Sequence, residues 1–415
     1  MISLATADSA LKDVYLGVVS DQLNTSINPL LARIKQTTTD VWGKEIVKLA
    51  PFGLNGGIGA GSETGTLPTA GGNNYCQFRL DLKNLYGKIE ISDKAIRASQ
   101  SSAGAFVNLL NAEMEGLVKA SSYNFGRMLY GNGDGALAIV QGNEASVSGT
   151  TTFKVDSTAA LVEGMVVDIV EDSGTPLLIS GAQQLKLKIV VVDRANKTVT
   201  LQTTKTYAKD ASIAEEGCTH RLYVQGSMGK ELTGLGKIFD TTQETLYGVE
   251  RAQNHWMNPY SISIASGNTM GNLSDISMQA VVDHLADGFD SNVDFIVGSS
   301  GVKRNYQYYL TSYRSNIDVM NLKGGYKAIS FNGVPFVSDR FAPQNTVYML
   351  NTAEFNLHQL CDWKWLEGED GRVLKQSANS PTYTATLVKY ADMICNKPCG
   401  QARIEGVAEL SSMPA

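Results

Sequence analysis

The amino-acid sequence predicts an α+β fold built from an extended hairpin, one very long helix and an inserted all-β segment. Three observations lead to this prediction. A glycine-dense stretch lies between two strand-like flanks at residues 45–91, an uninterrupted helical pattern follows at residues 93–130, and β-branched residues dominate residues 136–226. At 415 residues the chain is long enough for two or three domains with a sizeable core.

The glycine-dense stretch runs from Phe52 to Asn74 and reads FGLNGGIGAGSETGTLPTAGGNN. Such a segment loses much backbone entropy when it is fixed and buries little apolar surface in return. Its flanks partly alternate apolar and polar residues, which predicts a long two-stranded hairpin formed by Glu45–Leu49 and Tyr75–Ile91. Because an isolated hairpin is marginal in water, we expect the glycine-rich end to become ordered only against another molecule.

A single helix of about 38 residues is predicted for Asp93–Tyr130, which is about 57 Å at 1.5 Å per residue. The segment contains no proline, Ser92 can cap its first turn, and the glycines of Gly131–Gly135 end it. Apolar and small residues recur along one face, which predicts packing on a sheet and no cofactor contact. This stripe consists of Ala103, Val107, Leu110, Met114, Leu117, Ser121, Phe125 and Met128.

The N-terminal segment Asp8–Ile34 has apolar residues at broadly helical spacing, interrupted at Asn28–Pro29. It is amphipathic and terminal, so it can be an arm that docks on a partner. It can equally be an ordinary helix on the core of its own chain, and the sequence leaves both interpretations open.

The rest of the chain completes the α+β pattern. Residues 136–225 are nearly all strand-like, with a hairpin turn at Asp193–Lys197, and this predicts a small barrel or sandwich. From Gly229 onward, helices and strands alternate. Helices are predicted at 274–289 and 302–313, and strands at 293–297, 326–338, 346–351, 383–394 and 401–410, of which the last two would pair beneath the long helix.

Composition and charge exclude several classes of function. The formal net charge of −6 indicates no basic surface for tight nucleic-acid binding. No apolar run approaches the roughly 20 residues of a membrane helix, and the N-terminus has no secretory signal, so we expect an aqueous, cytoplasmic compartment and no membrane partner. The five cysteines are an odd number without zinc-site spacing, which predicts reduced structural thiols and no metal.

No catalytic or cofactor-binding constellation rises above background. Gly298–Lys303 follows a predicted strand and precedes a helix, as a phosphate-binding loop does, but it lacks the glycine spacing and the Lys-Ser or Lys-Thr pair. Gly57–Gly61 lacks the following helix that a dinucleotide site needs, and the four histidines are scattered. We therefore expect no enzyme, no cofactor and no metal, with a nucleotide-dependent enzyme at Gly298–Lys303 as a distant alternative.

The order of the predicted segments and the wording of several stretches point to one family. The order is N-terminal arm, glycine-tipped loop, long helix, α+β region and closing strands. The stretches are LNGGIGAGSETGTLPTAG, LYGKIEIS, KAIRASQSSAGAFVNLL, FGRMLYGNGDG, GGYKAISFNGVPFVSDR and QARIEGVAEL. In both respects the chain resembles the major capsid protein of tailed bacteriophages, whose fold is shared with herpesvirus capsid floors and encapsulins, and the resemblance spans nearly everything except the β insert.

The resemblance implies a division of the chain. It places an N-terminal arm at 1–44, an extended loop at 45–91, the spine helix and the start of the peripheral domain at 92–135, an inserted barrel-like or sandwich domain at 136–226, an axial domain at 227–375, and C-terminal strands that complete the peripheral domain at 376–415. The axial domain would reach the five-fold and six-fold axes of a shell, and the loop would lie over a neighbouring subunit and move during head maturation.

Inter-subunit contacts are implied for two sets of residues. At the loop tip these are Phe52, Asn55, Gly56, Gly57, Gly59, Gly61, Glu63, Thr66 and Leu67. On the N-terminal arm they are Leu11, Tyr15, Val18, Leu23 and Ile27. Some relatives join subunits through a loop lysine, but no lysine lies between Lys48 and Lys83, so we expect a shell held without covalent links.

The implied function is self-assembly into pentamers and hexamers of an icosahedral phage head, assembled in the host cytoplasm and retained in the virion. The expected partners are other copies of the chain, a separate scaffolding protein, a portal, and double-stranded DNA packed on the inner face without sequence specificity. An encapsulin-like compartment shell or a ring or tube protein of the tail remains the alternative.

Overall fold

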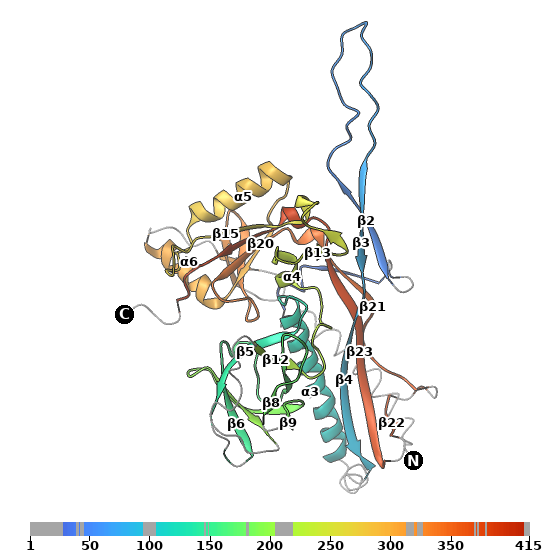
Figure 1. The fold of residues 1–415 in the computed structure, drawn as a ribbon, viewed down its shortest axis with the longest axis vertical. Helices are drawn as coiled ribbons and strands as arrows, with labels where there is room; N and C mark the ends of the chain where they lie inside the picture. Colours follow the sequence, from blue (N-terminus) through green and yellow to red (C-terminus); the bar gives the residue numbers. More distant parts are fainter. Residues whose placement is uncertain are drawn as a thin grey trace. The chain divides into compact units, whose positions relative to one another are not determined.

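The computed structural model describes residues 28–38, 41, 45–93, 105–144, 147, 149–179, 182–203, 219–312, 319–321, 327–368, 371, 373–377 and 380–410. The chain divides into two compact units, one formed by Met1–Gly126 with Lys237–Ala415 and the other by Arg127–Gly236. The fold is mixed α and β, with few helices and many strands in the described residues (Figure 1). None of the helices described is long and apolar enough to cross a membrane.

A long sheet in the first unit carries helix α3 (Ala105–Met128). Its described strands follow the order β1-β21-β23-β22, and β4 pairs with β23 on the side away from β21. The strands are β1 (Lys35–Thr37), β4 (Lys83–Ser92), β21 (Phe355–Trp365), β22 (Lys375–Gln376) and β23 (Thr382–Cys395). The short strand β1 is parallel to β21, whereas the other pairs are antiparallel.

Helix α3 (Ala105–Met128) packs on this sheet through part of the predicted stripe. The ring of Phe125 meets Trp363 of β21 edge to face at 6.3 Å. A Cβ added at Gly87 of β4 would lie 3.0 Å from Leu117, so the glycine lets helix and strand approach closely. Met114 and Phe125 are buried, as predicted, and Val118 is buried beside them.

The helix ends two residues earlier than predicted. The N–H groups of Tyr130 and Gly131 donate to the carbonyls of Arg127 and Met128, three residues back, so the last turn tightens and the α-helical ladder stops. The predicted start at Asp93 cannot be compared, because residues 94–104 lie outside the described part of the chain.

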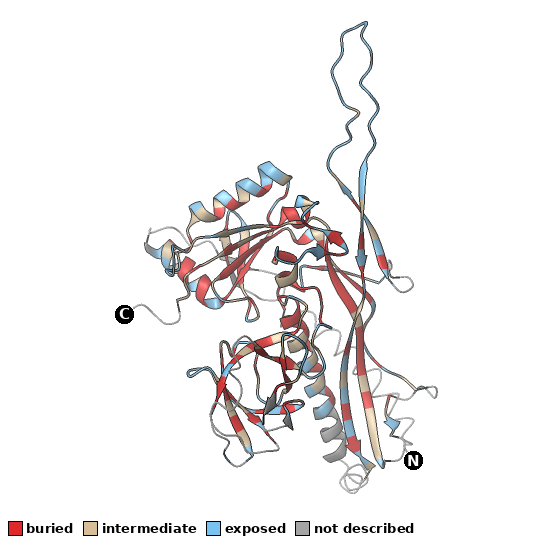
Figure 2. Ribbon diagram, in the orientation of Figure 1, coloured by how far each residue is buried: buried red, intermediate tan, exposed pale blue. Residues whose placement is uncertain are grey.

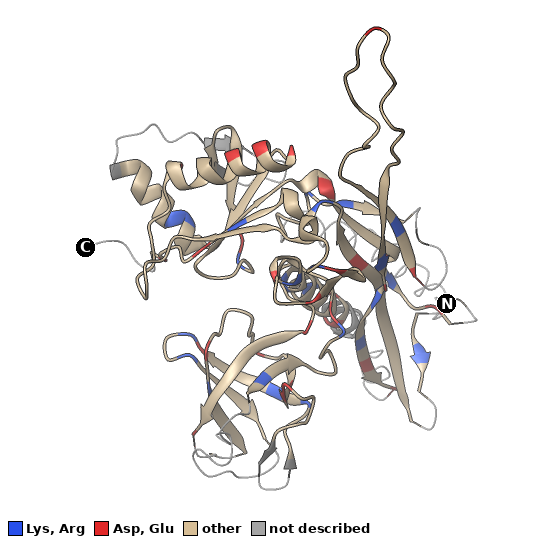
Figure 3. Ribbon diagram, turned by 45° about the horizontal axis from the view of Figure 1, so that its top comes forward, with Lys and Arg blue, Asp and Glu red and all other residues tan. Residues whose placement is uncertain are grey.

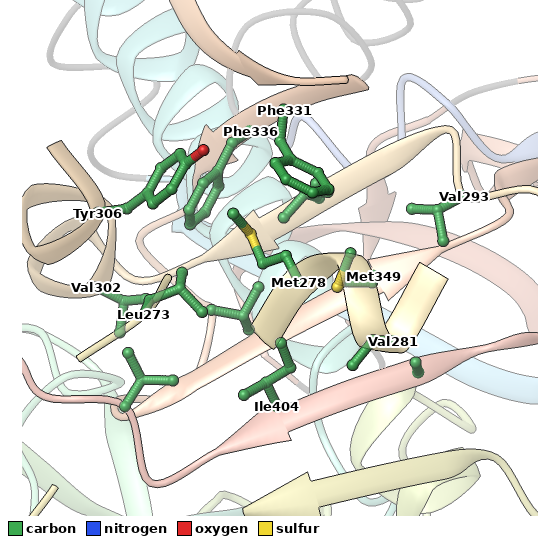
Figure 4. Close-up of a cluster of buried hydrophobic side chains, with 14 of the residues drawn as sticks. Leu273, Met278, Val281, Val293, Val302, Tyr306, Phe331, Phe336, Met349 and Ile404 are labelled. Atoms are coloured by element: carbon green, nitrogen blue, oxygen red, sulfur yellow. The ribbon is translucent and has the colours of Figure 1, made fainter. Parts of the chain in front are cut away.

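The second sheet of the first unit has the described strand order β15-β24-β20-β16-β19-β18-β17. Its elements are β15 (Tyr260–Ser263), α5 (Asp275–Phe289), β16 (Phe295–Gly298), α6 (Ser300–Ser312), β17 (Val319–Asn321), β18 (Lys327–Phe331), β19 (Val334–Ser338), β20 (Thr346–Leu350) and β24 (Ala402–Glu405). Helices α5 and α6 bury Met278, Val281, Val302 and Tyr306 against the sheet (Figure 4).

Local sequence explains the ends of α5. Ser274 and Ser277 form a reciprocal capping box at its start, and Asp290 adopts a left-handed conformation, with φ of 47°, at its end. The predicted helix at 274–289 is confirmed within one residue, and the predicted strand at 346–351 corresponds to β20. The strand predicted at 326–338 is two strands, β18 and β19, separated by a turn in which Asn332 and Gly333 both have positive φ.

The predicted placement of the C-terminal strands is wrong in one respect. Residues 401–410 do not pair beneath the long helix, since β24 lies between β15 and β20 in the second sheet. Ala402 and Ile404 are fully buried there, and the turn η3 (Pro398–Gly400) redirects the chain after β23. The predicted boundary near residue 375 also differs, because β21 and β22 belong to the long sheet.

The second unit contains a closed barrel with the order β10-β11-β6-β5-β12-β7. Its strands are β5 (Ala136–Asn143), β6 (Thr150–Val155), β7 (Val166–Glu171), β10 (Leu187–Asp193), β11 (Thr198–Gln202) and β12 (His220–Val224), with a small pair β8 (Leu178–Ile179) and β9 (Ala182–Gln183). Phe153, Val167, Ile169, Val199 and Leu222 fill its interior. The predicted turn at Asp193–Lys197 joins β10 to β11, with Lys197 at a φ of 52°.

Candidate assembly surface

The glycine-rich stretch connects the strands β2 (Ile46–Phe52) and β3 (Asn74–Leu80), which pair along their full length. The hairpin is shorter than predicted, because strand β3 ends at Leu80 and the chain continues after Asp81–Leu82 as β4 in the long sheet. Residues 83–91 are therefore part of that sheet and not of the hairpin.

The root of the hairpin, defined as β2 and β3, is fixed on one face by the rest of its own unit. Ile46, Ala50, Phe78 and Leu80 pack with residues of β13 (Thr245–Leu246), β14 (Val249–Glu250) and η1 (His255–Met257). Trp256 stacks on Phe52 at 5.1 Å and on Phe78 at 6.0 Å. Sequence analysis did not single out Trp256, because nothing near it in sequence marks it as a partner of the hairpin.

Tyr247 ties the root to β23. It sits in the β13–β14 turn with a φ of 53°, followed by Gly248 at 77°. Its carbonyl accepts from the N–H of Arg79 in β3, and its hydroxyl donates to the carbonyl of Met393 at 3.2 Å and accepts from the N–H of Cys395 at 3.0 Å. Burial raises the pKa of the Tyr247 phenol well above its ordinary value.

The opposite face of the root is bare. Val47 and Leu49 of β2 and Tyr75 of β3 are 54%, 60% and 59% exposed. Burial alternates along both strands, so these three side chains point away from the root cluster.

The tip, defined as residues 53–73, is exposed almost throughout (Figure 2). Of the predicted contact residues, Phe52 is half-buried on Trp256 and Gly57 is half-buried within the tip. The other predicted contact residues are exposed: Asn55, Gly56, Gly59, Gly61, Glu63, Thr66 and Leu67. Leu54 and Ile58, which were not among them, are 84% and 78% exposed, and Leu67 is 90% exposed.

The two arms of the tip lie close together because they lack side chains. A Cβ at Gly71 would stand 2.5 Å from the backbone nitrogen of Gly57, and a Cβ at Gly59 would stand 2.9 Å from Pro68. The side chain of Asn55 donates to Asn73 across the arms at 2.9 Å. The glycines therefore permit a thin ribbon that larger residues would force apart.

The backbone of the tip makes few hydrogen bonds. Within residues 53–73, the described backbone–backbone bonds consist of one turn, in which the N–H of Gly65 donates to the carbonyl of Ser62 at 3.0 Å. Glu63 is the only charged residue of this segment, which is otherwise uncharged in Figure 3. The ribbon thus offers peptide groups and a few apolar side chains to a partner.

The N-terminal candidates cannot be placed in the same way. Leu11, Tyr15, Val18, Leu23 and Ile27 lie outside the described residues. The described part that follows them is fixed on its own chain, since Leu30, Leu31 and Ile34 are buried and β1 pairs with β21. Residues 29–33 form turns and not the continuation of a helix.

The glycine loop at Gly298–Lys303 already faces an anion from its own chain. The Glu409 carboxylate accepts from the Ser299 hydroxyl and from the N–H of Asn345, and a Cβ at Gly301 would collide with it. A carboxylate at the start of α6 is favoured by the unpaired N–H groups there. In the described conformation, the carboxylate of Glu409 therefore occupies the position beside Ser299 and Gly301.

A buried lysine next to Phe125 of α3 was not predicted from the sequence. Lys389 of β23 is 1% exposed, and its Nζ donates to Gln359 at 2.7 Å and to Asp362 at 2.6 Å. The ammonium lies 5.1 Å from the ring centre of Phe125. Burial lowers its pKa, and Asp362 opposes that shift. Within the described residues no group of His, Cys, Asp and Glu could hold a metal ion, and Cys76, Cys361, Cys395 and Cys399 are free.

Comparison with solved structures identifies the fold. The capsid asymmetric unit of cyanophage A-1(L) matches with a TM-score of 0.52 and 12% sequence identity, over 92% of this chain and 93% of that chain. The chain has the phage capsid fold. The holo-SrpI encapsulin of Synechococcus elongatus matches at 0.47 with 8% identity, over 94% of this chain and 91% of that one. The capsid of Myoviridae phage XM1 matches at 0.43 with 10% identity over 92% of each. Because these last two scores are below 0.5, they add nothing to the assignment.

No family model matches the sequence, and no curated protein matches it either. The phage capsid fold is therefore established through structure. Because the sequence identity is only 12%, the match shows the fold and nothing more. Within this fold, the outward face of the hairpin root and the tip both expose large apolar side chains.

Proposed function

We propose that this chain is the subunit of an icosahedral phage head, which self-assembles into pentamers and hexamers around double-stranded DNA. The observation that carries the proposal is the contrast within the hairpin of a capsid-fold chain. A firmly packed root carries a tip that contributes almost nothing to its own stability. A segment of that kind gains stability only from contacts with another molecule.

The assembly would rest on heterologous contacts that repeat around rings and close into a shell. The bare hairpin face and the tip bring Val47, Leu49, Leu54, Ile58 and Leu67 into such contacts. Burial of apolar surface contributes about 25 cal/mol per Å² before the entropic costs of association. Because every copy contributes the same surface, modest contacts add up over the closed particle.

The predicted division supports the remaining parts of the proposal. The N-terminal arm at 1–44 would bind neighbouring copies, and the second sheet with α5 and α6 would form the axial domain around the symmetry axes. A separate scaffolding protein and a portal would take part in assembly in the host cytoplasm. The net charge of −6 suits an inner face that does not bind the packaged DNA tightly. The role requires no enzymatic activity, cofactor or metal.

A deletion tests the proposal directly. Removal of Gly53–Gly72 should leave a folded, soluble subunit, because these residues add nothing to the root cluster, while the variant fails to form particles in electron micrographs. As a control for folding, a short turn replaces the same loop and the root is left unchanged. Circular dichroism then compares the helical and sheet content of this variant with that of the parent. Normal shells from the deletion variant would contradict the proposed role of the loop.

Particle shape and content separate the proposal from its alternatives. Expression of the chain with scaffolding should give spheres of uniform diameter that carry DNA in infected cells. Spheres loaded with a protein cargo would favour a compartment shell, and tubes would favour a tail protein. Monomers alone at high concentration would speak against all three.

A further inference from the structure

Strand β4 presents the longest open edge of the long sheet. It pairs with residues 382–391 of β23 on one side, and no strand of the described chain pairs with it on the other (Figure 1). Alternate residues of an edge strand point their N–H and C=O groups outward, where they can pair with another strand. Between Asn84 and Glu90 this edge is long enough for a partner strand of several residues.

The other sheet edges are short or protected. On the opposite edge of the same sheet, β1 has three residues and covers only 356–358 of β21, and irregularities of the ladder interrupt the rest of β21. The edges of the second sheet are β15 with four residues and β17 with three. Strands β2 and β3 of the hairpin have seven residues each, three fewer than β4. Since proteins seldom leave a long flat edge open to solvent, the ten residues of β4 indicate an edge that is covered in the assembled state.

The side chains of β4 also favour a partner. Leu85, Ile89 and Ile91 are buried beneath α3, so the alternate residues face outward. Tyr86 is 63% exposed and meets Tyr390 of β23 edge to face at 6.2 Å. A strand added beside β4 would place its side chains next to this exposed aromatic pair.

The tip of the hairpin has the matching properties. Its extended residues have unpaired peptide groups, and Leu67 and Ile58 are highly exposed. The charges are complementary, because Glu63 gives the tip a charge of −1, whereas Lys83, Lys88 and Glu90 give β4 a charge of +1. Each copy of the chain carries one tip and one open edge, in equal numbers.

The tip cannot reach β4 of its own chain without destroying the hairpin. Strand β3 leads into β4 through Asp81–Leu82, and its seven residues hold the tip about 23 Å from that junction at about 3.3 Å per residue. Folding back would break the β2–β3 ladder and expose Phe78, which is fully buried. The partner must therefore be a second copy.

We propose that residues 66–72 of one copy add as a strand to the free edge of β4 in a neighbouring copy. The contact rests on the proposed function, and it specifies how the loop is held: mainly by main-chain hydrogen bonds, with Leu67 opposite Lys88 and diagonal to Tyr86. Such strand addition tolerates a glycine-rich sequence, because affinity comes from the backbone. Pro68 would face away from β4, since an added strand turns only alternate N–H groups toward its partner.

Site-directed cross-linking tests the pairing in the full-length chain. Leu67→Cys combined with Lys88→Cys should give a ladder of covalent multimers when assembled particles are oxidised. The matched control combines Leu67→Cys with Ile276→Cys, a position on α5 that is 79% exposed, and should give no ladder. Ile58→Cys with Lys88→Cys covers the other arm of the tip, and the parent chain measures the background from its own cysteines.

Hydrogen exchange provides a readout that does not depend on the exact register. Outward amides within residues 84–90 should exchange at least about tenfold more slowly in particles than in free subunits. The strand addition would be overturned if particles form normally but these amides still exchange rapidly and the Lys88→Cys variants give no ladder. That result would leave the shell function standing. Slow exchange already in free subunits would overturn it as well, by showing that the chain covers its own edge. Failure to form any particle would overturn both.

Discussion

The root and the tip of the hairpin are neighbours in sequence but differ in what stabilises them. At the root, Phe78 is fully buried and Trp256 stacks on two phenylalanines. At the tip, Leu67 is 90% exposed and one turn supplies the described backbone hydrogen bond. The comparison teaches that the core of the chain stops at Phe52, so that substitutions on either side of this point should affect different properties.

The largest effect is expected at the centre of the root. Phe78→Ala should lower the free energy of unfolding by about 3–5 kcal/mol, because it leaves a cavity between the hairpin, Tyr247 and Trp256. Urea unfolding of the free subunit measures this change. Leu49→Ala on the bare face is the matched control and should change stability by no more than about 0.5 kcal/mol. Equal losses from both variants would remove the distinction between the two faces.

A smaller effect with a pH signature is expected for Tyr247→Phe. The variant leaves the N–H of Cys395 without its acceptor and should cost about 1–2 kcal/mol at neutral pH. The pKa of Tyr247 is higher in the folded state than in the unfolded state. Above about pH 10 the unfolded chain therefore releases the phenol proton while the folded chain keeps it, and the free energy of unfolding falls as the pH rises. The variant should therefore show a flatter decline in alkaline unfolding curves than the parent, whereas Tyr75→Phe should follow the parent.

The boundary between root and tip is probed by Phe52→Ala. Loss of the stack on Trp256 should cost about 1 kcal/mol, since Phe52 is only half-buried. Unfolding free energy and tryptophan fluorescence report the change together. The neighbouring Leu54→Ala, beyond the boundary, should leave both unaltered, and a matching loss there would move the edge of the core into the tip.

The smallest effect on stability is expected at two adjacent glycines of the tip. Gly71→Ala places a Cβ 2.5 Å from the nitrogen of Gly57, whereas Gly72→Ala meets nothing within 4 Å. Both should unfold within about 0.5 kcal/mol of the parent. Only Gly71→Ala should reduce the yield of particles counted by electron microscopy, because it widens the ribbon. Equal particle yields from both would show that the close approach of the two arms is not needed.

Local signals in the sequence predicted much of this arrangement. The glycines after α3 act through residues near them in the chain, so the end of that helix was predicted within two residues. The Asn332–Gly333 turn carries a signal of the same local kind, but 326–338 was predicted as one strand. The exposed tip was predicted from a local signal as well, since its lack of packing residues is visible in the sequence itself.

Contacts between distant segments could not be predicted. Apolar and polar residues continue to alternate from β3 into β4. Only the pairing of β4 with residues 382–391 shows that the hairpin has ended at Leu80. Lys389 alternates with apolar residues like any exposed lysine, and its burial depends on Phe125 and Asp362 from other elements. Strand β24 was assigned to the wrong sheet because a buried strand carries no mark of which sheet it completes.

The way the chain enters and leaves the barrel has a consequence for how such a protein can change. The segments before β5 and after β12 lie side by side, joined by bonds from Gly229 to Asp134 and from Leu235 to Leu129, and by the buried pair of Arg127 and Glu231. A domain whose two ends lie close together can be replaced by another domain with adjacent termini, because the connections to the rest of the chain stay the same.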